Sequence, residues 1–556
     1  MAKFGSQTPV RSSSWGVIQS TPERVLNHEG VPAFARDAKS ELFLLGTTNF
    51  VSEDTYYETG QQRDTRYADL VVEVTKSDPV WVAHFAVYLR QVVNMRSVSV
   101  VTACEYARAG GPEARKVINA VCQRADEPGE ILAYWINKYG RPVPSNVKRG
   151  VADAARRLYT ERNQIKWDTA SHNWRWADVL NMVRPRPRSR TEEIERVARQ
   201  RVHATIDNPT RADFVRAEQE VNVENREGKL FLPDQSYLFG YCLDARKNSG
   251  APFYGEKLPM LSKRRDLLAL PKDKARALLL AEPERLVEAG MTWEALSSFG
   301  PMDKAAWEAV IPSMGYMALL RNLRNFDQAG VSDAVANQII AKLTDPEEVA
   351  KSRQLPVRFY SAYTNAPSLR WAYPLEQALD LSLANIEPFR GRTLVLVDTS
   401  DSMNRVAYSA KSTVKPITLA GLFGAALTRT GDVDVRLFAD RSVPFEFDKA
   451  SSVLKTMDDL LGEVGKIGWG TQLPEAFTHW NGQDRIIVLS DMETTSYMGN
   501  SIPNVPVYAF NLRESGSSIA DPSKRIYEIG GFTDNTFKMI NALESGRKAQ
   551  WPWDQK

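Results

Sequence analysis

The chain has 556 residues, more than one hydrophobic core normally supports, so we expect at least two domains. Apolar residues make up 43% and charged residues 25%, a balance typical of soluble globular proteins that excludes a largely disordered chain. The longest nearly continuous apolar run, residues 80–89, is too short to span a membrane. The three widely spaced cysteines match neither a disulfide framework nor a zinc site. The start of the chain has no apolar secretory segment, so we expect a cytoplasmic protein with no membrane contact.

The formal net charge of +3 is unevenly distributed. Residues 391–556 contain 18 Lys and Arg and 20 Asp and Glu, which gives a balance of −2. Residues 141–201 contain 15 Lys and Arg against 7 Asp and Glu, a local balance of +8. Such a concentration of positive charge either attracts polyanions or forms a solvated face.

The first part of the chain predicts helices. Residues 1–30 show little periodicity and are rich in Ser, Thr and Pro, so we expect a tail or strap there. Over residues 31–370 apolar residues recur at helical spacing, with breaks every ~15 to 20 residues. This rhythm is typical of stacked helical hairpins, although no exact sequence repeat accompanies it. The expected helices lie within residues 68–76, 81–93, 99–110, 114–125, 129–140, 147–163, 274–290, 304–326 and 332–343.

The second part predicts an α/β domain. Short apolar strands are expected at residues 393–398, 433–438, 485–491 and 505–512, and helical stretches at 414–430 and 450–464 lie between them. Alternation of this kind indicates a parallel sheet covered by helices on both faces. The pattern changes between residues 365 and 390, and we place the second domain at 371–556. The predicted fold class is therefore α followed by α/β.

Oxygen-bearing side chains gather at the expected strand ends. Asp398 ends one strand and is followed by Ser400 and Ser402, Asp491 ends another, and Thr471 follows a glycine-containing loop. Ligands of parallel sheets bind at the carboxyl ends of the strands. Two carboxylates and three hydroxyls suit Mg²⁺ or Mn²⁺ and suit zinc or copper poorly. The alternative is that Asp398 only caps the following turn. No nucleophile or acid–base group accompanies these residues, so we expect no enzymatic activity.

The basic segment of residues 141–201 combines cations with aromatic residues. Residues 148–166 carry arginines and lysines among helix-favouring residues, Trp167, Trp174 and Trp176 follow, and residues 184–190 read RPRPRSR. Phosphate neutralisation next to stacking surfaces is the combination that flexible RNA requires. A solvated charged face and tryptophans in the helical core are the alternatives. The proline-containing run is expected to be extended, and it either contacts phosphate or forms a loop.

The strand-end residues resemble a known metal site. The pattern Asp-x-Ser-x-Ser, a Thr after glycines and an Asp ending another strand is similar to the metal-ion-dependent adhesion site of von Willebrand factor A domains, and all five positions match. The resemblance implies a bound divalent cation with one position open to an acidic group. It also supports an alternative function, a metal-dependent adaptor that binds an acidic group of a protein partner.

Other segments resemble TROVE modules, the helical part of the Ro ribonucleoprotein autoantigen family. They are SMGYMALLRNLRNF (313–326), ELFLLGTTNFVSEDTYYETG (41–60), RRLYTERNQIKW (156–167) and NWRWADVL (173–180). A further segment, YEIGGFTDNTFKMIN (527–541), resembles the end of the family's von Willebrand factor A domain. The resemblance implies a monomeric ring of HEAT-like helical pairs followed by a Rossmann-like von Willebrand factor A domain. It further implies binding of Y RNAs on the basic outer surface and of single-stranded 3′ ends of misfolded RNAs in the central hole. In bacterial relatives a Y RNA tethers an exoribonuclease, polynucleotide phosphorylase.

The same resemblance points to individual residues. By position it assigns RNA contacts to Arg156, Arg157, Arg162 and Lys166. Where the family has a histidine after the tryptophan of the next loop, this sequence has Trp176, with His172 slightly upstream. Arg321 and Arg324 either point into the hole or make structural hydrogen bonds. The full set of candidate RNA contacts is Lys148, Arg149, Arg156, Arg157, Arg162, Lys166, His172, Arg175, Trp176, Arg184, Arg186, Arg188, Arg321 and Arg324. We thus expect a non-catalytic RNA-binding protein that acts in RNA quality control, processing or decay.

Overall fold

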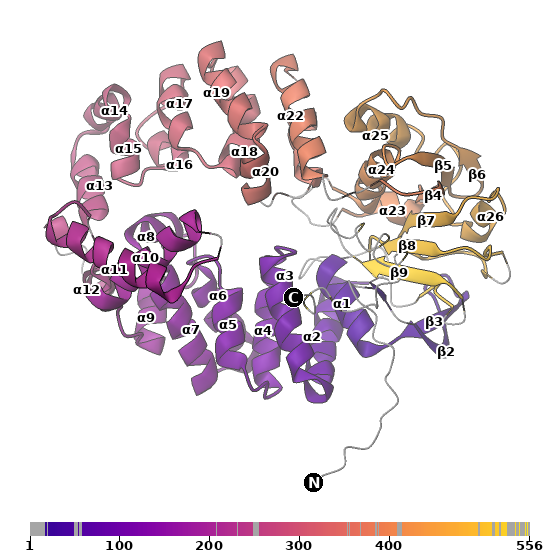
Figure 1. Ribbon diagram of the computed structural model, residues 1–556, viewed down its shortest axis with the longest axis horizontal. Coiled ribbons are helices and arrows are strands. Elements are labelled where there is room, and N and C mark those ends of the chain that lie inside the picture. The colour runs from indigo at the N-terminus through magenta and orange to yellow at the C-terminus, as the bar shows by residue number, and fades with distance from the viewer. Residues whose placement is uncertain are drawn as a thin grey trace, which may run out of the picture. The chain divides into compact units, whose positions relative to one another are not determined.

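The computed structural model of the protein (Figure 1) describes most of the chain. The described residues are 17–18, 20–48, 54, 58–206, 208–230, 232–247, 255–352, 354, 356–366, 368–383, 386, 388–407, 414–498, 501–513, 518–521, 524–530, 537, 540, 544, 551 and 553. Of the predicted tail, residues 1–16 lie outside this set. So do parts of two segments that carry the family resemblance, 41–60 and 527–541.

By contacts between residues, the chain divides into two compact units. One unit comprises residues 1–111 and 315–556, and the other comprises residues 112–314. The predicted domains, 1–30, 31–370 and 371–556, follow chain order and remain a prediction. A division in chain order separates segments that pair in space, because the strand at 17–18 is hydrogen-bonded to the strand at 526–530.

The unit of residues 112–314 is built from helices. They are α5 (Ala114–Val121), α6 (Glu127–Tyr139), α7 (Ser145–Leu158), α8 (Glu161–Trp167), α9 (Trp176–Val183), α10 (Arg190–Thr205), α11 (Arg211–Arg226), α12 (Gln235–Lys247), α13 (Pro259–Ala269), α14 (Lys272–Ala281), α15 (Glu284–Glu288), α16 (Trp293–Ser297) and α17 (Lys304–Val310), with short 3-10 turns η1 (Gly255–Lys257) and η2 (Ile311–Ser313). Helices near in sequence pack on one another, as α5 does on α7 and α10 on α11. This is the packing expected of stacked helical hairpins.

The other unit contains further helices and a sheet. Its first helices are α1 (Ala38–Thr48), α2 (Gly60–Ser77), α3 (Pro79–Gln91) and α4 (Arg96–Arg108); later come α18 (Tyr316–Gln328), α19 (Asp333–Leu343), α20 (Pro346–Ser352), α21 (Pro356–Asn365) and α22 (Leu369–Ser382), and finally α23 (Asp401–Arg405), α24 (Pro416–Leu427), α25 (Val453–Leu461) and α26 (Leu473–Phe477). None of the helices in the described part of the chain has the length and apolar character needed to cross a membrane.

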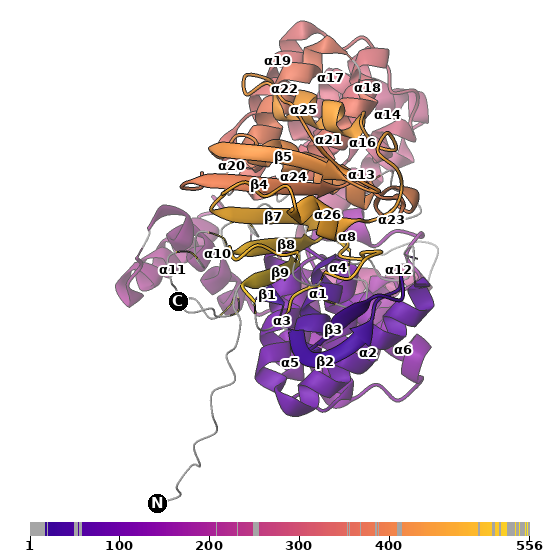
Figure 2. The same cartoon turned by 90° about the vertical axis from the view of Figure 1, so that its right-hand side faces the viewer.

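The sheet is mixed and mostly parallel. Its strands are β1 (Val17–Ile18), β4 (Arg392–Asp398), β5 (Asp432–Phe438), β6 (Ser442–Pro444), β7 (Arg485–Ser490), β8 (Val507–Asn511) and β9 (Ile526–Gly530). Within the described residues their order is β1-β9-β8-β7-β4-β5-β6. The five inner strands are parallel, and β1 and β6 are antiparallel edges. Figure 2 shows the inner strands side by side, with β4 and β7 adjacent.

Apolar side chains on both faces of the sheet explain its position between helices. On one face Leu394 and Leu396 join a buried cluster with Phe477 of α26. On the other face α24, which is buried along its whole length, lies so close that a Cβ on Gly424 would meet Val397 at 3.1 Å. Strands buried on both faces read as continuous apolar runs, and this explains why β4 and β7 were predictable.

The predicted helices and the four predicted strands are confirmed as elements, but three long helical stretches are interrupted. The stretch 274–290 breaks between α14 and α15, at Pro283. The stretch 147–163 breaks between α7 and α8, where Thr160 accepts a hydrogen bond from the Asn163 amide and starts a new helix. The stretch 304–326 breaks at η2, which contains Pro312.

Several strands were not predicted. The expected strap contains β1 and all of β2 (Ser20–Leu26), which forms a two-stranded antiparallel pair with β3 (Pro32–Arg36). β3 lies at the start of the predicted domain 31–370, ahead of the helical pattern, which begins at about residue 36. β2 has the sequence STPERVL and is largely exposed, so it lacks the apolar alternation by which a half-buried strand is recognised.

Candidate functional site

The predicted strand-end residues come together in the structure. Asp398 ends β4, and Asp491 follows β7, its parallel neighbour. All five predicted ligands are buried: Asp398, Ser400, Ser402, Thr471 and Asp491. The Ser400 and Ser402 hydroxyl oxygens are 3.2 Å apart, and the Ser400 amide donates to Asp398 Oδ1 at 2.9 Å. Five oxygen-bearing side chains thus lie at one edge of the sheet.

Burial dominates the electrostatics of the two aspartates. Burial raises the pKa of Asp398, and the charge of Asp491 raises it further. Burial also raises the pKa of Asp491, although a hydrogen bond from Ser402 and the charge of Arg513 oppose this. A divalent cation between the carboxylates would remove the repulsion between them. The donors are hard oxygens and fit Mg²⁺ or Mn²⁺. Groups of three or more His, Cys, Asp or Glu that could hold a metal do not occur among the described residues. The predicted set differs from such groups, because three of its five members are hydroxyls.

Two further residues of this site were missed in the sequence. Ser490 donates to Asp398 Oδ2 at 2.5 Å and so fixes the carboxylate from the neighbouring strand. Asp440, just after β5, accepts the Gly470 amide at 2.7 Å and the Trp469 amide at 3.3 Å, which holds the loop before Thr471. Both residues could have been found in the sequence from their position at the end of an expected strand. Asp440 ends the run FAD (438–440), and Ser490 lies within LSD (489–491).

Replacing Gly468 with alanine is expected to destabilise this loop. Gly468 has φ +106°, and an added Cβ would lie 1.9 Å from an Asp440 carboxylate oxygen. The strain and the displaced carboxylate should lower the free energy of unfolding by about 1–3 kcal/mol. Chemical denaturation of the variant tests this, with Gly482→Ala as a control because its Cβ would meet nothing within 4 Å at a φ that is also positive, +75°. Equal losses in both variants would contradict the role of Asp440.

The cationic candidates of the helical unit fall into two groups. The first group is half-buried or exposed and has no ion pair within the described residues: Lys148 and Arg149 on α7, Arg162 on α8, and Arg184 and Arg186 after α9. Positive charge that no neighbouring carboxylate neutralises is available to an anionic ligand. These five residues are called the open cation group below.

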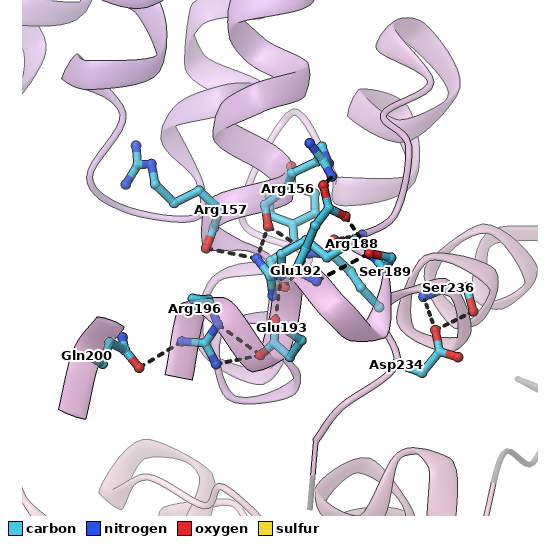
Figure 3. Close-up of polar contacts among 12 residues, drawn as sticks. Arg156, Arg157, Arg188, Ser189, Glu192, Glu193, Arg196, Gln200, Asp234 and Ser236 are labelled. Carbon is cyan, nitrogen blue, oxygen red and sulfur yellow. Dashed lines mark hydrogen bonds and ion pairs between the residues drawn. The ribbon is translucent and has the colours of Figure 1, made fainter. Parts of the chain in front are cut away.

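The second group is engaged within the protein (Figure 3). Arg156 pairs with Glu192 at 2.7 Å, and Arg188 pairs with the buried Glu193 at 2.8 Å. Arg157 donates to the carbonyl oxygens of Asn119, at 2.6 Å, and Cys122. Burial lowers the pKa of both Arg157 and Arg188. These arginines connect helices and loops, and their charge is already partly compensated.

Arg175 and His172 are also held by the protein. The Arg175 guanidinium pairs with Asp168 at 2.6 Å and donates to the Asp168 carbonyl oxygen at 2.7 Å. His172 Nδ1 lies 3.0 Å from the Thr169 hydroxyl, and Nε2 lies 3.6 Å from Asp126. Both side chains are half-buried and fasten the loop before α9.

Trp176 does not lie on a surface. Its side chain is 2% exposed and stacks on Tyr159 with ring centroids 3.6 Å apart. Trp176 must be corrected from a candidate contact to a core residue, because α9 directs its apolar face inward. Trp167 and Trp174 are half-buried instead, and the Trp167 ring centroid lies 3.9 Å from the Arg124 guanidinium and 4.8 Å from the Lys166 ammonium. Arg124 was missed because it lies outside the basic segment in the sequence.

Replacing Arg188 with methionine is expected to destabilise the helical unit. The substitution leaves Glu193, whose side chain is 2% exposed, with Arg196 at 2.5 Å as its remaining ion-pair partner. Breaking a buried ion pair costs about 3–5 kcal/mol, and the remaining partner should reduce this to about 2 kcal/mol. Urea denaturation measures the loss. Arg188→Met combined with Glu193→Leu should recover part of it, and a double variant less stable than Arg188→Met would contradict the assignment.

The other unit contains a second cationic feature. A hollow of about 360 Å³ on α18 and α21 is lined by Arg321, Arg324 and Arg358, together with Asn325, Asn365 and small or apolar side chains. All three arginines are exposed, and none has an ion pair within the described residues. The lining of this hollow includes no aspartate or glutamate. Arg358 was missed because its sequence neighbours are mostly apolar or polar and give no basic run.

Comparisons with known proteins relate one segment of the chain to a known domain. The family model of the TROVE domain matches residues 265–379. A Deinococcus radiodurans protein described as "RNA-binding protein RO60" is 24% identical over 277 residues, which is 43% of this chain and only 51% of that relative. A Caenorhabditis elegans protein of the same description is 21% identical over 80% of this chain and 74% of that relative. Residues 265–379 thus match the TROVE domain, and the wider similarity is to proteins described as RNA-binding.

The fold of the chain also has a solved counterpart. The crystal structure of the Deinococcus radiodurans RO (RSR) protein superposes with a TM-score of 0.58 at 18% identity, over 92% of this chain and all of that one. At this identity the likeness shows the fold, a helical-repeat-rich chain with a mixed parallel sheet. The arginine hollow of α18 and α21 lies inside the matched TROVE segment. The open cation group and the strand-end site lie outside it.

Proposed function

We propose that this protein binds RNA and has no catalytic role of its own. The observation that carries the proposal is the open cation group: five lysine and arginine side chains on α7, on α8 and after α9 that no carboxylate of the described residues neutralises. Cations of this kind bind phosphate and release counterions from a nucleic acid. The two relatives described as RNA-binding proteins support RNA as the polyanion.

The ligands that we propose are a small noncoding, Y-like RNA and the single-stranded 3′ ends of misfolded or structured RNAs. The open cation group would contact a folded RNA, and the arginine hollow of α18 and α21 supplies three further unpaired charges for a strand. Through such RNAs the protein would act in the cytoplasm in RNA quality control, processing or decay, and a bound RNA would tether an exoribonuclease such as polynucleotide phosphorylase. We expect the protein itself to be monomeric.

Sequencing of RNA that copurifies with the protein from its own cells tests the identity of the ligand. The proposal predicts enrichment of one or a few short structured RNAs, together with RNAs that have free single-stranded 3′ ends. The matched control is a variant with Arg162, Arg184 and Arg186 changed to glutamate, which should lose the enrichment. Copurified RNA that reflects total cellular RNA in both samples would contradict the proposal.

The sheet supports a second candidate function. We propose that its domain is of the von Willebrand factor A type and that Asp398, Ser400, Ser402, Thr471 and Asp491 hold Mg²⁺ or Mn²⁺ to capture an acidic group of a protein partner. The favouring observation is the loop before Thr471, where Trp469 is 49% exposed beside the buried oxygen donors. A pull-down that needs Mg²⁺, survives ribonuclease treatment and fails for Asp398→Ala would support this adaptor function; a pull-down that needs RNA would contradict it.

A further inference from the structure

The turn between β2 and β3 rests on the loop that follows Asp491. Both segments belong to the same compact unit. The turn begins at Asn27, which is buried and whose Nδ2 group donates to the Thr494 carbonyl oxygen at 2.8 Å. The next residue contributes a second contact, because the His28 amide donates to the Glu493 carboxylate at 3.0 Å. The acceptors lie two and three residues beyond Asp491, so the turn meets the chain directly beside a predicted metal ligand.

Asn27 uses the two ends of its side-chain amide for two separate purposes. Oδ1 accepts from the Glu29 amide at 3.1 Å and from the Val31 amide at 2.8 Å, and these bonds shape the turn itself. Nδ2 makes the contact with Thr494. Aspartate can replace the oxygen but not the donor, because a carboxylate accepts hydrogen bonds and does not donate them. The contact with the loop can therefore be removed while the bonds within the turn remain.

The loop begins with a backbone conformation that needs support. Met492, directly after Asp491, is buried and has φ +65°, in the left-handed region that residues other than glycine rarely adopt. Such a residue keeps its conformation only where the surrounding structure holds it. The Ser490 hydroxyl holds one side, because it accepts from the Met492 amide at 3.0 Å. The turn between β2 and β3 holds the other side, through Glu493 and Thr494.

The same loop also positions a second predicted ligand. The Thr494 hydroxyl and the Thr495 amide both donate to the Thr471 carbonyl oxygen, each at 3.0 Å. The Glu493 amide donates to Asp491 Oδ1 at 3.3 Å. A shift of this loop would therefore displace Asp491 and Thr471 together, and these residues come from two different sides of the predicted site.

The turn is attached less firmly than the other end of the hairpin. At that other end, the amide and the carbonyl oxygen of Phe34 pair with Ser518, and Arg36 forms a fully buried ion pair with Glu528 at 2.7 Å. Next to the turn, β2 is mostly exposed, and Leu26 is 68% exposed. Elements held by few buried contacts open locally more readily than core elements. Contact between the turn and the loop can thus be lost while the rest of the hairpin stays in place.

We propose that the turn between β2 and β3 is a clamp on the loop that follows Asp491, in which Asn27 positions Asp491 and Thr471 for a divalent cation. The inference rests on the proposed metal site and goes beyond it, because it makes the affinity for the cation depend on a distant segment of the sequence. Closing of the clamp and binding of the cation then strengthen each other by the same factor, as linked equilibria must.

Binding of Mn²⁺ to the full chain, measured by electron paramagnetic resonance, tests the proposal. Asn27→Asp keeps the acceptor that shapes the turn and loses the donor to Thr494, so it should weaken Mn²⁺ binding roughly three- to tenfold. The direction of the change is informative, because an added negative charge near a cation site would by itself tighten binding. Leu26→Asp is the control: it alters the net charge equally at an exposed neighbour, and it should bind Mn²⁺ at least as tightly as the wild type.

Hydrogen exchange of the wild type gives a second readout that needs no variant of the turn. The His28 amide, which donates to Glu493, should exchange roughly three- to tenfold more slowly in Mg²⁺ than in EDTA, by the same linkage. The Phe34 amide, which donates to Ser518 at 3.0 Å, should change much less. Asp398→Asn should remove the effect of Mg²⁺ on the His28 amide.

The inference alone is overturned if the wild type binds the cation but Asn27→Asp, folded by thermal melting, binds it equally well. It is also overturned if Mg²⁺ leaves the exchange of the His28 amide unchanged, or slows the Phe34 amide by the same factor, since equal slowing indicates general stabilisation. A wild type that binds neither Mn²⁺ nor Mg²⁺ overturns the proposed metal site and the inference with it.

Discussion

Changing Arg184 and Arg186 together to glutamate is expected to weaken RNA binding by roughly tenfold or more and to flatten its dependence on salt. Both side chains are exposed and have no ion pair within the described residues. Each lost phosphate contact should reduce the slope of log K against log salt by about 0.7–0.9, so the double change should reduce it by about 1.5. Filter binding over a salt series measures both effects, and thermal stability should stay nearly constant because neither residue contributes to packing.

The control must separate the loss of contacts at this surface from the effect of a changed net charge. Arg211 and Arg226 are exposed on α11 of the same helical unit, and changing both to glutamate alters the charge of the protein by the same amount. Binding should change much less in this variant. A loss equal to that of the Arg184 and Arg186 variant would show general electrostatic attraction, which contradicts the assignment of this surface.

Replacing Asp398 with asparagine is expected to abolish stabilisation by Mg²⁺ without unfolding the protein. In the wild type, Mg²⁺ at about 100 times its dissociation constant should add about 2.7 kcal/mol to the free energy of unfolding. The variant loses one of the two carboxylates, so it should show no such increase. It also loses the repulsion between two buried charges, and without metal at neutral pH it should be at least as stable as the wild type. Melting curves with Mg²⁺ and with EDTA measure these differences.

The same pair predicts the pH dependence of the metal-free wild type. Burial raises the pKa of both Asp398 and Asp491 above the ordinary aspartate value of 3.8. The folded protein then holds protons that the unfolded chain releases, so stability contributed by this pair is lost as the pH rises above 3.8 toward the raised values. In EDTA the wild type should lose more stability over this range than Asp398→Asn does, and Mg²⁺ should restore the difference.

Asp401 provides the control for both experiments. It lies within the same loop but is not one of the predicted ligands. Its carboxylate forms an ion pair with Arg405 at 2.6 Å. Asp401→Asn should keep the full response to Mg²⁺. Loss of the response in this variant, or its persistence in Asp398→Asn, would contradict the predicted ligand set.

The sequence predicted those elements whose burial leaves a periodic pattern. β4 and β7 are covered on both faces and read as apolar runs, and α7 has a clear helical period. β2 was missed because it is mostly exposed, and β6 because three residues carry no periodicity. The pairing of β1 with β9 joins residues about 500 positions apart, and no local pattern reports such a contact.

The candidate sites divide in the same way. The strand-end oxygens could be predicted because topology brings the carboxyl ends of parallel strands together whatever the loops do. Whether each arginine forms an ion pair could not be predicted, because ion pairing depends on tertiary neighbours. Arg156 and Arg188 meet glutamates of α10, whereas Arg184 and Arg186 meet none within the described residues. The sequence suggested Trp176 as a possible stacking surface for RNA. In the structure it packs on Tyr159, because a tryptophan in a helical array more often belongs to the hydrophobic core.

The central claim, RNA binding through unpaired cations, is tested most directly by the salt dependence of wild-type binding to an RNA hairpin with a single-stranded 3′ tail. The open cation group contains five charges. If most of them contact phosphate, log K should fall against log salt with a slope of about −3 or steeper. Absence of binding at low salt, or binding with a slope near zero, would contradict the account.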